Sequence, residues 1–126
     1  MFSHVMVGSN DLEASRAFYD ATLGALGAKP AVENSGRLVY MHAGGLFIVT
    51  KPIDGAEACH ANGGTIGFAG ASPEQVDAWH AAGVAAGGTP IENDPGVREG
   101  GFGKLYLAYL RDPAGNKLCS MYRIPA

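Results

Sequence analysis

The first half of the sequence is repeated in the second half with a constant shift of 61 positions. The run His4-Val5-Met6-Val7 corresponds to Thr65-Ile66-Gly67-Phe68, and Phe18 falls opposite Trp79. In each copy a strand-like run leads through a short cap into an amphipathic helix. Two copies of one supersecondary unit predict a pseudo-two-fold domain with a cavity between its halves, and clefts of this kind commonly bind ligands.

The first copy is predicted to fold in the order β-α-β-β-β. Residues 2–9 alternate in polarity, which favours a strand. Asn10 and Glu13 have the spacing of a helix N-cap and its reciprocal partner, and the helix is expected to end at Gly24 and Gly27. The predicted inner face of that helix comprises Leu12, Ser15, Phe18, Tyr19, Leu23 and Leu26. Short strands are predicted at residues 28–34, 37–43 and 46–51, joined by glycine-containing turns.

The second copy is predicted to repeat this order. Ser72-Pro73-Glu74-Gln75 is a strong helix start, because it offers a serine N-cap, a proline in the first turn and a glutamine that can reach back. The glycine-rich residues 96–103 are predicted to form a loop that could act as a lid. The expected strands are at residues 64–70, 89–93, 104–111 and 117–123, with Asp112-Pro113-Ala114-Gly115 as the last turn. The expected inner face of the second helix comprises Val76, Trp79, His80 and Gly83.

These patterns predict an α+β fold in a single domain of 126 residues. Its first module covers about residues 1–52, the linker about 53–63, and the second module about 64–126. Each helix has one apolar face and each set of strands needs cover, so the helices should pack outside curved sheets. The inner faces of the sheets would then line a central cavity.

Composition excludes several classes of function. A net charge of −3, with scattered rather than clustered basic residues, argues against a nucleic-acid partner. The sequence has no run of about 18 apolar residues, and its N-terminus lacks the features of a signal peptide, so a cytoplasmic protein without membrane contact is expected. Cys59 and Cys119 are too few for a disulfide scaffold and are predicted to be free thiols.

Two stretches of the sequence together carry a resemblance to a known family. The first comprises His4-Val5-Met6-Val7, Asp11-Leu12-Glu13-Ala14-Ser15, Phe18-Tyr19 and Leu23-Gly24, and the second is Leu110-Arg111-Asp112-Pro113-Ala114-Gly115-Asn116-Lys117-Leu118. They resemble the vicinal oxygen chelate superfamily, which holds glyoxalase I, extradiol dioxygenases and bleomycin-resistance proteins. The resemblance covers nearly the whole chain. It implies paired βαβββ modules that form a cupped sheet around a central cavity, and a homodimer by analogy with the family.

In metal-dependent members of that superfamily the ligands come from equivalent strands of the two modules. By resemblance the four positions fall on His4, Ile48, Thr65 and Cys119, with Val49 in place of Ile48 if the register is off by one. A catalytic zinc needs about three protein ligands, and an iron oxygenase site needs two histidines and a carboxylate. This set falls short of both. The carboxylate that would act as a base in glyoxalase chemistry is also missing at Cys119.

No cofactor is therefore predicted, and a divalent metal (Zn, Ni, Fe or Mn) is the alternative. His42 or His60 could supply a missing ligand, although surface positions are expected for both. His4 as a base and Cys119 as a nucleophile are the candidate catalytic residues. For His4 the alternative is a histidine in a cavity wall, and for Cys119 it is a small buried apolar residue.

Strand alternation predicts which side chains line the cavity. The lining is small and apolar and suits a small, largely hydrophobic molecule, so a binding protein without a complete metal site is the leading hypothesis. A lyase or isomerase resembling lactoylglutathione lyase is one alternative, and an accessory or regulatory module that acts through a protein partner is the other. Gly67, Ala69 and Leu46 share the faces of the predicted lining residues, which are His4, Met6, Ile48, Thr50, Thr65, Cys119 and Met121.

Overall fold

The computed structural model describes residues 1–126 and contains two helices and nine strands. Neither helix has the length and apolarity that a membrane crossing requires. In chain order the elements are β1 (Val5–Gly8), α1 (Leu12–Ala25), β2 (Val32–Asn34), β3 (Arg37–His42), β4 (Gly45–Thr50), β5 (Ile66–Ala69), α2 (Pro73–Ala85), β6 (Thr89–Pro90), β7 (Gly96–Gly100), β8 (Gly103–Arg111) and β9 (Lys117–Arg123).

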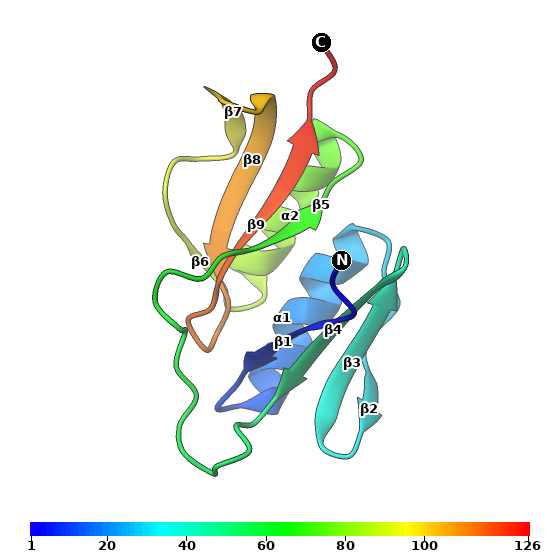
Figure 1. Ribbon diagram of the computed structural model, residues 1–126, viewed down its shortest axis with the longest axis vertical. Coiled ribbons are helices and arrows are strands. Elements are labelled where there is room, and N and C mark those ends of the chain that lie inside the picture. The colour runs from blue at the N-terminus through cyan, green and yellow to red at the C-terminus, as the bar shows by residue number, and fades with distance from the viewer.

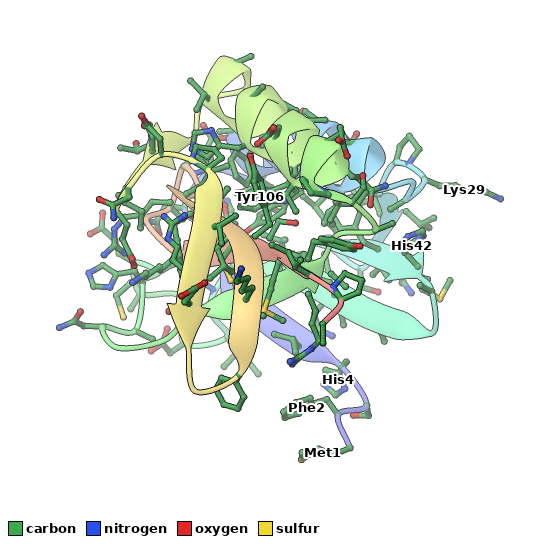
Figure 2. All side chains as sticks on the ribbon, turned by 90° about the horizontal axis from the view of Figure 1, so that it is seen from above. Met1, Phe2, His4, Lys29, His42 and Tyr106 are labelled. Atoms are coloured by element: carbon green, nitrogen blue, oxygen red, sulfur yellow. The ribbon has the colours of Figure 1, made fainter.

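Each half of the chain forms its own sheet. The first sheet has the order β1-β4-β3-β2, and the second has the order β5-β9-β8-β6 with β7 also paired to β8. In both sheets the strand before the helix pairs in parallel with the last strand of the module, and the remaining pairs are antiparallel. Figures 1 and 2 show the two sheets on one side of the molecule and both helices on the other. The predicted α+β fold is confirmed, and neither sheet closes into a barrel.

The helix boundaries follow from their caps. Ser72 accepts a hydrogen bond from the N–H of Gln75 at 3.1 Å, as predicted for the N-cap. The side chain of Gln75 reaches back as expected, but it accepts from the N–H of Ala71, one residue before the cap, at 2.7 Å. The cap of α1 differs from the prediction by one residue. Asp11 is the N-cap, because the side chain of Asn10 is bound to the backbone of Ala58 in the linker.

The two halves share one hydrophobic core, which lies between the helices and the sheet faces next to them. Phe18 of α1 and Trp79 of α2, which are 61 positions apart, are both fully buried in it. The shift becomes 60 where the helices end, because α2 has 13 residues and α1 has 14. Gly27 and Gly87, both at φ 99°, therefore occupy the equivalent left-handed positions. The constant shift of 61 predicts Gly88 as the counterpart of Gly27, which is wrong by one residue.

Several predicted strand boundaries need correction. The strand predicted at residues 28–34 is limited to Val32–Asn34, and the one predicted at residues 89–93 is limited to Thr89–Pro90. The predicted glycine-rich loop is a β-hairpin in which β7 pairs with β8. Arg98 holds this hairpin in place, because its guanidinium donates to four backbone carbonyls at 3.0–3.2 Å. A lid role for this segment is not supported by such a paired structure.

Candidate functional site

An apolar pocket of about 320 Å³ lies at the seam between the two modules. We call it the seam pocket. Its walls are the edge strand β5, the starts of β1 and β4, the β3–β4 turn and the C-terminal end of α1. Phe47 and Phe68, one from each module, meet edge to face in its wall with ring centroids 5.3 Å apart. The lining residues are Val5, Leu23, Leu26, Ala28, Tyr40, His42, Ala43, Gly45, Leu46, Phe47, Ile66, Gly67, Phe68 and Ala69.

The seam pocket offers few polar groups. Eleven of its fourteen lining residues are hydrophobic, and no carboxylate lines it. The hydroxyl of Tyr40 donates to Oδ1 of Asp20 at 2.7 Å. Burial, with this hydrogen bond, raises the pKa of Tyr40, which keeps the hydroxyl neutral. His42 is an exposed side chain at the rim, where Figure 2 shows it beside the β3–β4 end of the first sheet. The pocket can therefore enclose an apolar group and has no paired acid and base.

The strand register places the predicted lining residues on the sheet faces that point away from the helices. Met6 pairs with Ile48 across β1 and β4, and Gly67 pairs with Cys119 across β5 and β9. Ile48 and Cys119 are therefore equivalent positions of the two modules. Val49, the alternative, is fully buried on the opposite face.

The predicted residues do not gather around one cavity. None of the seven predicted lining residues borders the seam pocket. Leu46, Gly67 and Ala69 do border it, and they lie on the same strand faces as the predicted residues. Met6 and Thr50 instead border a wider hollow of about 800 Å³ beside the linker. The hydroxyl of Thr50 donates to the carbonyl of Lys51 at 3.1 Å. Met121 is partly buried on β9, next to Ala69 of β5.

The four positions that the resemblance assigns to a metal bring together few donor atoms. His4 lies on the N-terminal segment, which Figure 2 shows running away from the body of the molecule, and its ring shares a hydrogen bond of 2.8 Å with the hydroxyl of Ser3. Ile48 has no donor atom, and Thr65 offers only an exposed hydroxyl. No group of three or more His, Cys, Asp or Glu side chains is arranged to hold a metal ion.

Cys119 has the character of a buried apolar residue. It is 9% exposed, and burial raises the pKa of its thiol, with a further rise from Glu92 and an opposing effect of Lys117. A raised pKa lowers the thiolate fraction, which is the reactive form. The ring of His4 shares its hydrogen bond with Ser3 and not with Cys119. The other thiol, Cys59, is exposed in the linker, and both cysteines are free, as predicted.

The sequence matches the model of the Glyoxalase/Bleomycin resistance protein/Dioxygenase superfamily over residues 1–119. The chain belongs to this superfamily. A crystal structure of a glyoxalase/bleomycin resistance protein from Albidiferax ferrireducens T118 is 61% identical, with a TM-score of 0.96 over 98% of this chain and 99% of that one. No curated protein matches the sequence.

Solved structures of lower identity share the fold. A hypothetical protein from S. aureus, SA1046, is 21% identical with a TM-score of 0.75, over 98% of this chain and 94% of that one. Lactoylglutathione lyase from Agrobacterium tumefaciens is 20% identical with a TM-score of 0.66, over 96% of this chain and 92% of that one. At this level of identity the likeness concerns the fold alone.

The strand patterns missed several residues that line the seam pocket. Four residues that alternate toward the helices pack against or within the core and also border the seam pocket. They are Val5, Phe47, Ile66 and Phe68. Because β1 and β5 are both edge strands that do not pair with one another, the core remains open between them. The signal for this opening was the repeat itself, since two equivalent modules predict a cavity between them.

Proposed function

We propose that this superfamily member binds a small, largely hydrophobic molecule in the seam pocket, without a complete metal site. The observation that carries the proposal is the apolar lining of a pocket that both modules build. Its volume of about 320 Å³ falls at the lower end of the usual range for ligand sites, which suits a compact molecule. Transfer of apolar surface out of water supplies the affinity, at about 25 cal/mol per Å².

A neutral fluorescent probe, N-phenylnaphthylamine, tests this function directly. The wild-type protein is expected to bind it saturably. Leu46→Asn places an amide in the pocket wall and should weaken binding about tenfold, because a buried amide without a partner is costly. Val97→Asn is the matched control, since Val97 is an exposed strand residue of β7 outside the pocket. Equal affinity in all three proteins would contradict the proposal.

The metal-free part of the proposal has its own test. It is supported by the donor set, in which His4 is an exposed side chain on the N-terminal segment and Ile48 offers no donor. Mass-spectrometric metal analysis of untagged protein should find no transition metal in stoichiometric amount. Stoichiometric zinc, nickel, iron or manganese that is lost in His4→Ala would overturn this part and would favour the lyase alternative.

A homodimer is part of the same proposal. The sheet faces opposite the helices carry uncovered apolar side chains, among them Met41 at 70% and Met6 at 41% exposure. A second copy would remove this surface from water. Sedimentation velocity should show a dimer, and Met41→Glu should shift it toward the monomer. A wild-type protein that sediments as a monomer at every concentration would contradict it.

A further inference from the structure

A second, polar pocket of about 140 Å³ lies where the linker passes the turn between β8 and β9. We call it the linker pocket. It differs from the seam pocket in having no hydrophobic lining residue. Its walls come from two parts of the chain that the proposed function does not use. The lining residues are His60, Asn62, Gly63, Gly64, Thr65, Arg111 and Lys117.

Two cationic residues line the linker pocket. Arg111 and Lys117 are directly opposite partners at the end of the antiparallel pair β8–β9, so their side chains leave the same face of the sheet. Like charges in that position repel each other. The carboxylate of Glu92 lies 2.5 Å from Nζ of Lys117, and Arg111 has no carboxylate partner. The pocket therefore keeps an excess of positive charge in a chain whose net charge is −3.

Both cations are held in place by the protein. Nη1 of Arg111 donates to the carbonyl of Gly115 at 2.7 Å, which leaves the other nitrogen donors of the guanidinium unused. Lys117 is fixed between Glu92 and the ring of Tyr109, whose centroid is 5.2 Å from Nζ. Arg111 and Lys117 are each only partly exposed. A site whose charges are already positioned loses little side-chain entropy when it binds a ligand.

The linker adds neutral donors to these charges. A turn closed by a 3.0 Å hydrogen bond from the N–H of Gly64 to the carbonyl of Ala61 presents the residues between them. The side chains of His60, Asn62 and Thr65 line the pocket and make no hydrogen bond within the chain. A Cβ atom on Gly115 would lie 3.6 Å from Cβ of His60, which shows how closely the linker passes the turn. The linker pocket thus combines two cations with unused hydrogen-bond donors.

We propose that the linker pocket binds a small oxyanion group, either a carboxylate or a phosphate. Arg111 supplies charged N–H donors in the fork geometry that suits both groups, and Lys117 adds a second positive charge. Thr65 and Asn62 complete the shell as neutral donors. An anion between the two cations removes their mutual repulsion. The proposal stands on the geometry of the linker pocket and does not depend on what the seam pocket binds.

Titration of ¹⁵N-labelled protein with sodium phosphate and with sodium acetate tests this site, with sodium chloride at equal ionic strength as the reference. Saturable shifts are expected for the amides of residues 60–65 and for the side chain of Arg111. Saturation by phosphate alone assigns a phosphate group, and saturation by acetate as well assigns a carboxylate. Shifts that follow ionic strength equally in chloride, or that map elsewhere, would overturn the proposal.

Substitutions give the second arm of the test. Arg111→Met should weaken anion binding about tenfold, because a charged hydrogen bond is lost. Lys104→Met removes the same charge from an exposed ion pair with Glu99 in the β7–β8 hairpin and should leave binding unchanged. Thr65→Val keeps the shape of the side chain and tests the site if Arg111→Met fails to fold. Undiminished affinity in both pocket variants would overturn the proposal, whereas N-phenylnaphthylamine binding reports on the seam pocket separately.

Discussion

The hydroxyl of Tyr19 donates a hydrogen bond of 2.5 Å to Oδ2 of Asp112. Tyr19 belongs to α1 of the first module, and Asp112 begins the turn between β8 and β9 of the second module. Both residues are buried. The amide of Asn116 donates to the same carboxylate oxygen at 2.8 Å and to the carbonyl of Gly8 at 3.0 Å. This buried network therefore joins the two halves of the chain at a point that hydrophobic contacts alone do not specify.

Tyr19→Phe should destabilise the protein by about 1.5–3 kcal/mol, because a hydrogen bond to a buried carboxylate is lost while the ring remains. Chemical unfolding in urea measures the change. Tyr122→Phe is a suitable control, since Tyr122 is a partly buried residue whose hydroxyl makes no hydrogen bond within the chain. If the two variants lose the same stability, the link between Tyr19 and Asp112 does not hold the modules together.

The buried position of Tyr19 beside Asp112 makes the stability of the protein fall at alkaline pH. Burial, followed by the charge of Asp112 and the hydrogen bond to it, raises the pKa of Tyr19 well above the usual value of 10.0. The folded protein then holds this proton more tightly than the unfolded chain. The contribution of Tyr19 to the free energy of unfolding is therefore fully present below pH 10.0. It falls as the pH rises above that value, by about 1.4 kcal/mol per pH unit for one proton. Tyr19→Phe should lose stability less steeply, and identical pH slopes in urea unfolding would disprove this assignment.

The sequence was informative where structure depends on neighbouring residues. The period of apolar side chains predicted the buried face of α1, and Ser72 with Gln75 predicted the start of α2, because caps and helix faces are set within a few positions. The repeat predicted equivalent strands in the two modules. The sequence left open whether Ile48 or Val49 is the counterpart of Cys119. The strand pairing shows that it is Ile48.

The sequence was less informative where distant segments meet. The glycine-rich residues 96–103 indicated a loop, yet Arg98 and pairing with β8 make them a hairpin. Asn10 had the spacing of a cap, but the linker residue Ala58 binds its side chain and leaves the cap to Asp11. The seam pocket is lined by two edge strands, β1 and β5, that do not pair with each other. Local sequence patterns do not show how distant segments are placed relative to each other, so pocket residues such as Phe47 and Phe68 were not predicted.

Two helix glycines should respond to alanine in opposite ways. A Cβ at Gly83 of α2 would lie 2.3 Å from Cδ1 of the buried Leu110 and 3.0 Å from Cγ2 of Thr22 in α1, whereas a Cβ at Gly24 of α1 would meet nothing within 4 Å. Gly24→Ala should raise the free energy of unfolding by up to about 1 kcal/mol through helix propensity. Gly83→Ala should lower it by about 1–2 kcal/mol, because overpacking exceeds that gain. Urea unfolding of both variants measures the difference, and a stabilised Gly83→Ala would show that the helices have room to separate.

The two thiols should react at very different rates in the native protein. Cys59 is exposed in the linker, whereas Cys119 is buried and its pKa is raised by that burial. An aromatic disulfide reagent at neutral pH should therefore modify one thiol quickly and the second only as the protein unfolds. Cys59→Ser should remove the fast phase, and Cys119→Ser should leave it intact. A fast phase that survives in Cys59→Ser would mean that Cys119 is accessible and partly ionised, and would restore it as a candidate nucleophile on the face opposite the helices.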